Sequence, residues 1–230
     1  MKRSLLVLAA LAAVAAAPAL AQATTEWDGL VHVKSKRLKA VFLLPGADFR
    51  AYSKVMIDPP ESAFRKDWVR DYNRANRDSG SRVTDAEAAE ALGSVKSGFA
   101  EILDEEFRKG GYQVVTTPGA DVLRIRSGVV DLDVKTPEPR GAGRTNVYSE
   151  EAGEATLIIE ARDSLTNALL GRGVEARVAG YNVSLLRNRQ TNRRDFEMLF
   201  RDWAQASVRG LGTLKEMSPV DTNAIAKRKR

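Results

Sequence analysis

The chain has 230 residues, of which 43% are hydrophobic and 29% charged, and a formal net charge of +6. This composition is typical of a globular protein and excludes a chain that is disordered throughout. It contains no cysteine and a single histidine, which excludes disulfides, thiol nucleophiles, thiolate metal sites and a lipid anchor on cysteine.

The first 23 residues have the pattern of a secretory signal peptide. Lys2 and Arg3 precede an apolar run at residues 5–20, and Ala-Gln-Ala follows at residues 21–23. The run is shorter than the roughly 20 apolar residues that cross a bilayer, and the small residues match a cleavage site. We therefore expect cleavage after residue 21 or 23. The product would be a periplasmic protein with no lipid anchor and no transmembrane segment.

The rest of the chain is predicted to form one α/β domain, residues 24–220, and a basic disordered tail, residues 221–230. A short strand is expected at residues 52–57, and the two prolines at positions 59 and 60 end it. Residues 61–83 are rich in Arg, Asp, Asn and Ser, which indicates a loop or a short helix.

A long helix is predicted at residues 84–109. Thr84 and Glu87 match an S/T-x-x-E capping box, and Gly110-Gly111 end the segment. Apolar residues recur along it at spacings of three and four, which gives the helix one face to bury.

The segment after this helix is predicted to be mostly strand. Two strands are expected at residues 112–115 and 121–134. The apolar residues of the second change parity along the strand, which places a bulge at Ser127-Gly128. A mobile connector, residues 135–150, follows. Alternating apolar residues then predict a hairpin with strands at 154–162 and 170–178.

A second helix is predicted to begin near Asn192 or Arg193 and to end around Met217, because its apolar residues also recur at helical spacing. Two amphipathic helices can bury their apolar stripes against one sheet. The expected fold is therefore α+β, an α/β two-layer sandwich. Its mostly antiparallel sheet would have about five strands, with two main helices packed on one face.

The side chains that catalysis needs are few. His32 is the only histidine, and no G-x-S-x-G motif supplies a serine nucleophile. Zinc needs three or four ligands, usually nitrogen or sulfur, so neither a metal nor another cofactor is expected. Asp131 and Asp133 are predicted to share a strand face, where they can form a carboxylate pair, although an exposed sheet face explains them equally well. A carboxylate-dependent hydrolase of an envelope substrate therefore remains an alternative.

Cations and aromatic side chains offer binding surfaces instead. Two basic clusters are candidates for contact with an anionic surface such as lipid headgroups, lipopolysaccharide or wall polymers. In a third segment an aromatic residue recurs every four positions, and packing on the sheet is the alternative to ligand contact there. The residues are Lys34, Lys36, Arg37 and Lys39 in the first cluster, Arg187, Arg189, Arg193 and Arg194 in the second, and Phe64, Trp68 and Tyr72 in the aromatic segment.

Several short segments resemble those of a known protein family. They are WDGLV at 27–31, PGADFRAYSKVMIDP at 45–59, GGYQVV at 110–115, PGADVLRIR at 118–126, EARDSLT at 160–166 and FRDWA at 200–204. With these segments in this order, the chain resembles the bacterial family known as domain of unknown function 3313. The resemblance implies an exported envelope protein and no catalytic residues. Many members look like lipoproteins, whereas this chain has no cysteine to acylate.

The sequence thus predicts an exported, non-catalytic binding or accessory module of the bacterial cell envelope. Its partner would be an envelope protein or an anionic envelope component, and export excludes nucleic acid. Affinity for an anionic component should fall as salt is raised. Besides the hydrolase, the alternative is a structural subunit of an envelope oligomer, which an uncovered apolar sheet face or an open edge strand would indicate.

Overall fold

The computed structural model describes residues 26–77, 82–135 and 148–222. The predicted signal peptide, most of the predicted connector and most of the predicted basic tail lie outside these ranges. Within them, no helix is both long enough and apolar enough to span a membrane.

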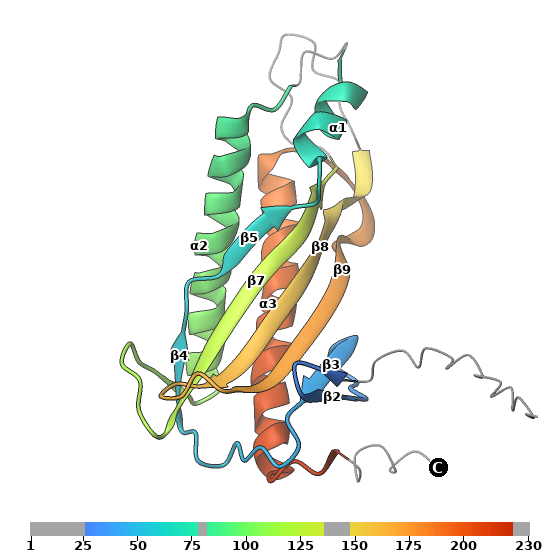
Figure 1. The fold of residues 1–230 in the computed structure, drawn as a ribbon. Coiled ribbons are helices and arrows are strands. Elements are labelled where there is room, and N and C mark those ends of the chain that lie inside the picture. Colours follow the sequence, from blue (N-terminus) through green and yellow to red (C-terminus); the bar gives the residue numbers. More distant parts are fainter. Residues whose placement is uncertain (1–25, 78–81, 136–147, 223–230) are drawn as a thin grey trace, which may run out of the picture.

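The described residues form nine strands and three helices (Figure 1). The strands before the first long helix are short, and the three longest strands lie between the two long helices in the sequence. The strands are β1 (Glu26–Trp27), β2 (Leu30–Val33), β3 (Ala40–Leu43), β4 (Lys54–Ile57), β5 (Glu61–Phe64), β6 (Gln113–Val114), β7 (Val122–Val134), β8 (Tyr148–Asp163) and β9 (Leu169–Leu186). The helices are α1 (Trp68–Ala75), α2 (Asp85–Lys109) and α3 (Arg189–Glu216).

The strands of the described residues form one mixed sheet in the order β1-β2-β3-β9-β8-β7-β4-β6, and β5 also pairs with β7. All neighbours along the path β1-β2-β3-β9-β8-β7 are antiparallel. Strand β4 is parallel to both β6 and β7, and β5 is parallel to β7. The α+β class and the two main helices are confirmed. The expected sheet of about five mostly antiparallel strands is wrong in its strand number and misses the parallel part. Parallel pairing needs a crossover, and α2 supplies it between β4 and β7.

Helices α2 and α3 pack on the same face of the sheet, as expected (Figure 1). Between ring centroids, Phe99 of α2 lies 5.2 Å from Phe200 and 6.5 Å from Trp203 of α3. These rings share one buried core with Leu123 of β7 and Leu157 of β8. The other face of strands β7, β8 and β9 is not covered by either long helix.

Reciprocal caps fix where both long helices begin. In α2 the Thr84 hydroxyl accepts a hydrogen bond from the Glu87 N–H, and the Glu87 carboxylate accepts one from the Thr84 N–H, as the capping box predicts. Helix α3 begins earlier than the predicted Asn192, because Asn188 and Thr191 form an equivalent cap through side-chain oxygen atoms.

The bulge in β7 lies at Asp131 and not at the predicted Ser127-Gly128. Asp131 has a φ of 50°, and the register with β8 shifts between Val130 and Asp133. Val129 is fully buried, whereas Val130 is only half-buried. The prediction was wrong because it assigned Val130 to the core face, which moved the change of parity upstream.

The predicted hairpin is confirmed as β8 and β9, but both strands extend well beyond it. The register between β8 and β9 shifts twice between Ser149 and Gly153 of β8, and Gly180 on β9 pairs with Glu151 in this irregular part. A Cβ on Gly153 would lie 2.0 Å from the Asp133 carbonyl oxygen, so the close approach of β7 requires glycine there. These irregularities interrupt the alternation of apolar and polar residues, and the sequence pattern therefore shows only the regular central part.

Two segments with weak sequence patterns also contribute. Residues 61–83 contain the short helix α1, which was one of the two predictions for this segment, and the unexpected strand β5. The N-terminal strands β1, β2 and β3 add an edge to the sheet beside β9. The loop between β2 and β3 contains the first predicted basic cluster and borders the candidate site.

Candidate functional site

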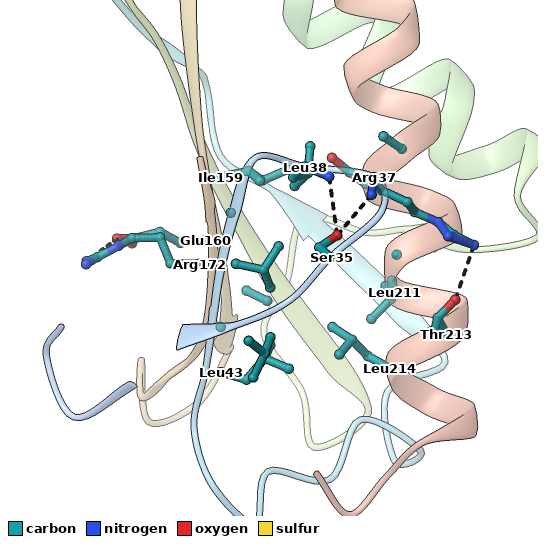
Figure 2. A pocket seen from close by; sticks show the side chains of 18 of the residues that line it. Ser35, Arg37, Leu38, Leu43, Ile159, Glu160, Arg172, Leu211, Thr213 and Leu214 are labelled. Atoms are coloured by element: carbon teal, nitrogen blue, oxygen red, sulfur yellow. Dashed lines mark hydrogen bonds and ion pairs between the residues drawn. The ribbon is translucent and has the colours of Figure 1, made fainter. Parts of the chain in front are cut away.

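A pocket with a volume of about 300 Å³ lies between the sheet and the C-terminal half of α3 (Figure 2). Its floor is the face of the sheet that both long helices cover, and α3 forms a wall. The loop between β2 and β3, residues 34–39, borders the pocket on the solvent side. Ligand pockets have volumes of about 300–1,000 Å³, so this one can take a small ligand.

The pocket exists because small residues occupy positions where the core would need large ones. Along α3 the buried Trp203 is followed by Ala206 and Gly210, both of which line the pocket. A Cβ on Gly210 would meet no atom within 4 Å. On the sheet, Gly171 and Gly173 of β9 line the opposite side, and the side chains of Leu43 and Leu38 pack against them. Because protein interiors are normally close-packed, a hollow of this size requires small residues such as Ala206 and Gly210 in its wall.

The interior surface of the pocket is mostly hydrocarbon. The Ser207 hydroxyl donates a hydrogen bond to the Trp203 carbonyl at 2.8 Å, and the Thr213 hydroxyl donates one to the Arg209 carbonyl at 3.1 Å. These hydroxyls are therefore engaged within α3. The apolar lining includes Leu38, Leu43, Ile125, Ile159, Leu211 and Leu214.

Hydrogen bonds within the loop, and from the loop to β9 and α3, hold it over the pocket. The Ser35 hydroxyl accepts bonds from the N–H groups of Arg37 at 3.0 Å and Leu38 at 3.3 Å. The Lys39 N–H donates to the carboxylate of Glu175 on β9. The Arg37 guanidinium reaches across to α3, where its Nη2 lies 3.3 Å from the Thr213 Oγ1 (Figure 2).

The solvent side of the pocket is positively charged. Lys34, Lys36, Arg37 and Lys39 are all exposed, as the sequence predicted for a contact surface. In the part of the chain that the structure describes, no carboxylate forms a salt bridge with any of these four side chains. Their charge is therefore available to an anion from solvent.

The acidic residue among the pocket residues does not offset this charge. Glu160 accepts hydrogen bonds from Arg172, with Nη2 at 2.7 Å, and from Arg162, with Nε at 2.8 Å. Figure 2 shows the side chains of Glu160 and Arg172 directed away from the loop and from α3. Burial alone would raise the pKa of Glu160, but the two arginines lower it below its ordinary value of 4.5, so the carboxylate stays ionised and paired.

The second predicted basic cluster lies elsewhere, at the start of α3. With a rise of 1.5 Å per residue, Arg193 and Thr213 are separated by about 30 Å along the helix. Arg187 is not a surface residue: its side chain is 1% exposed and bonds Asp195 at 2.5 Å. It also donates two hydrogen bonds to the Ser149 carbonyl. Its predicted role in anion contact is therefore wrong, since the guanidinium joins β8 to α3.

The other cations of this cluster remain on the surface. Arg189, Arg193 and Arg194 are exposed, and the Arg193 Nε bonds the Glu197 carboxylate one turn along α3 at 2.6 Å. None of these three arginines lines the pocket beside the loop between β2 and β3.

The aromatic segment forms a stack. Phe64 and Trp68 have parallel rings with centroids 4.1 Å apart, and Tyr72 lies 5.6 Å from Trp68. Trp68 is 3% exposed and donates its indole N–H to Asp133 at 3.1 Å. The packing alternative therefore holds for Trp68, and only the half-buried Phe64 and Tyr72 are partly accessible to a ligand.

The residues considered for catalysis do not converge. Asp133 accepts hydrogen bonds from Arg65 at 2.6 Å and from Trp68, whereas Asp131 is exposed at the bulge. His32 is exposed on β2, with its ring 5.2 Å from that of Phe42. Among the described residues, no group of three or more His, Cys, Asp or Glu side chains is placed to hold a metal ion.

A family model matches residues 21–207 of the chain, and its description is "Protein of unknown function (DUF3313)". The chain belongs to this family. The match confirms the resemblance found in the sequence. The match assigns no activity to the DUF3313 chain, because the description of the family names none. No curated protein matches the chain.

Three of the solved structures that are similar to this DUF3313 chain share little sequence with it. A PelC L103M dodecamer from Paraburkholderia phytofirmans is 12% identical, with a TM-score of 0.39, over 72% of this chain and 94% of that one. A Xanthomonas campestris protein is 12% identical, with a TM-score of 0.41, over 76% and 91%. A minor lipoprotein from Acinetobacter baumannii is 12% identical, with a TM-score of 0.34, over 70% and 94%. Similarity at this level indicates no ligand or activity for the chain.

The pocket was not predicted from the sequence, although the basic loop beside it was. The signal that could have revealed it is the change along α3 from large apolar residues to Ala206 and Gly210. Gly171 and Gly173 at alternate positions of a strand give a second signal on the sheet, because they leave room for the pocket residues Leu43 and Leu38. Small residues in both elements predict a gap only once it is known that α3 crosses this end of β9.

Proposed function

We propose that this protein is an exported, non-catalytic binding module of the bacterial cell envelope that binds an anionic envelope component at the loop between β2 and β3. One observation carries the proposal: Lys34, Lys36 and Arg37 are exposed without a carboxylate partner among the described residues, and they border an open apolar pocket. A cationic rim beside an apolar cavity provides both attraction and contact area for an anionic ligand.

The periplasmic location rests on the predicted signal peptide at residues 1–23. Fractionation of producing cells, followed by mass spectrometry of the purified chain, tests it. We expect a periplasmic chain without a lipid that begins at residue 22 or 24. A full-length chain in the cytoplasm would contradict the export part of the proposal.

The hydrolase alternative loses the carboxylate pair on which it was based. Asp133 is held by Arg65 and Trp68, and Asp131 lies at the bulge, on the surface. Two carboxylates that act on one bond need to face each other across a cleft. The basic loop therefore supports binding better than these residues support hydrolysis.

Binding to vesicles tests the proposed function. We expect the protein to bind vesicles that contain phosphatidylglycerol and not vesicles of phosphatidylcholine alone, with affinity falling as salt rises. Each cation near an anionic lipid surface contributes about 1 kcal/mol, so the Lys34→Gln, Lys36→Gln, Arg37→Gln triple variant should bind roughly 100-fold more weakly.

A matched control removes the same charge elsewhere. The Arg189→Gln, Arg193→Gln, Arg194→Gln triple variant also loses three positive charges, but at the other end of α3. We expect it to keep most of the vesicle binding. Equal losses in the two triple variants would mean that net charge alone drives binding, and the loop would not be the site.

A structural-subunit role has a separate observation in its favour. Within the described residues, β3 covers only residues 171–174 of the β9 edge. Residues 176–186 of β9 therefore have β8 as a strand neighbour on one side and no strand on the other (Figure 1). Val178 and Leu186 on this stretch are 47% and 37% exposed. Open edges with apolar side chains pair readily with other strands. Light scattering during size exclusion tests this role: a monomer at all concentrations would exclude it.

A further inference from the structure

We infer that the pocket binds the hydrocarbon chain of a single-chain anionic amphiphile, such as a free fatty acid, with its carboxylate at Lys34, Lys36 and Arg37. This inference rests on the proposed function, because it places the anionic ligand at the same loop. It adds the class of ligand and a second contact, in which the chain enters the space between β9 and α3.

The chemistry of the lining selects an aliphatic ligand. The hydroxyls of Ser207 and Thr213 are bonded to carbonyl groups of α3, and the Ser35 hydroxyl already accepts two backbone N–H groups. The side chains of Glu160 and Arg172 bond each other and point away (Figure 2). A sugar or a peptide inside this pocket would leave its own polar groups without partners, which is costly. A hydrocarbon chain has no such groups.

The volume sets the length of the chain. An apolar cavity of about 150 Å³ accommodates one benzene molecule, so a pocket of twice that volume accommodates on the order of a dozen carbon atoms. The volume here is about 300 Å³. One saturated chain of roughly 12 carbons fits by this estimate, whereas the two chains of a membrane phospholipid exceed it.

The charge places the head group. Lys34, Lys36 and Arg37 lie on the solvent side of the pocket, and Arg37 already reaches over to Thr213 of α3. A carboxylate at this position would accept charge-assisted hydrogen bonds from these cations while its chain runs inward. An uncharged amphiphile of the same length would gain only the burial of its chain.

A series of straight-chain carboxylates from 6 to 14 carbons tests the inference by calorimetry. The protein is first passed over a hydrophobic resin, and each ligand is kept below its micelle concentration. Burial of each methylene should tighten binding about fourfold, until roughly 12 carbons fill the pocket and the affinity levels off. Affinity that is independent of chain length would overturn the inference.

Two leucine substitutions separate the pocket from the helix that forms it. Gly210 lines the pocket, Gly212 does not, and a Cβ at either position meets no atom within 4 Å. We expect Gly210→Leu to weaken dodecanoate binding at least tenfold and Gly212→Leu to leave it unchanged. Equal affinities in the two variants would overturn the inference. The length series on the unsubstituted protein gives an answer even if a variant fails to fold.

Further ligands test the head group and the number of chains. The methyl ester of dodecanoate should bind roughly tenfold more weakly than the acid, because it lacks the charge. Stronger binding by dihexanoyl phosphatidylglycerol than by dodecanoate would overturn the single-chain assignment. Vesicle binding through the loop without carboxylate binding would refute this inference and leave the proposed function standing. Loss of both would refute the site itself.

Discussion

The buried ion pair between Arg187 and Asp195 gives the sharpest prediction about stability. The two side chains are 1% and 3% exposed, and the Arg187 Nη1 lies 2.5 Å from the Asp195 Oδ2. Arg187→Met would leave the Asp195 charge buried without its partner and remove two donors from the Ser149 carbonyl. Removing one partner of such a pair costs about 3–5 kcal/mol, which corresponds to a fall in Tm of roughly 10 °C.

A double-mutant cycle in urea measures this cost and its cause. Asp195→Leu should also destabilise strongly, because it leaves the Arg187 charge buried. The double variant Arg187→Met, Asp195→Leu should lose much less than the sum, since neither charge remains. Additive losses, or a loss below about 1 kcal/mol for Arg187→Met, would place Arg187 among the surface cations and refute the reasoning.

Three further substitutions test other parts of the structure. Gly93 of α2 is exposed, and its Cβ would meet no atom within 4 Å, so Gly93→Ala should raise the free energy of unfolding in urea by about 1 kcal/mol. Gly153→Ala would place its Cβ against the Asp133 carbonyl and should cost about 3 kcal/mol in the same assay, and a neutral result would contradict the close approach. Burial and a hydrogen bond to Asp163 raise the pKa of Tyr52 to about 12. The stability that neutral Tyr52 contributes is therefore complete below pH 10 and is lost as the pH rises toward 12. Between pH 9 and pH 11 the free energy of unfolding of the unsubstituted protein should fall by about 1 kcal/mol more than that of Tyr52→Phe, and equal falls would show that Tyr52 titrates normally.

Much of the helical part of the fold was readable from local sequence. The capping box of Thr84 and Glu87 fixes the start of α2, and its apolar stripe predicts the face that packs on the sheet. The cap of α3 was missed because Thr191 takes the place that glutamate or glutamine takes in the usual pattern. Signals of this kind work because the interacting groups are neighbours in the sequence.

The sheet was predicted less well because its pairing is not local. No residue in β4 or β5 shows that it lies parallel to β7, and both strands are only four residues long. The extension of β8 and β9 past Gly153 and Gly180 is hidden because the irregular register breaks the period of two. Such features depend on which strands meet in space.

The candidate site was half predictable for the same reason. Exposed cations next to each other in the sequence, such as Lys34 and Lys36, can be recognised as a charged surface. The pocket lies between Gly173 of β9, against which Leu38 packs, and Gly210 of α3, and these residues come together only when the helix packs across the sheet. The sequence could also not show that Arg187 is buried, since burial depends on the packing of β8 against α3.

Photocrosslinking with a dodecanoate that carries a diazirine near its methyl end is the most direct test of where the ligand binds. Crosslinked peptides are identified by mass spectrometry after digestion. The account predicts adducts on residues that line the pocket, namely Leu38, Leu43, Ile159, Leu211 and Leu214, and their loss in Gly210→Leu. Adducts concentrated at Arg189–Arg194 or on the uncovered face of β7, β8 and β9 would contradict it.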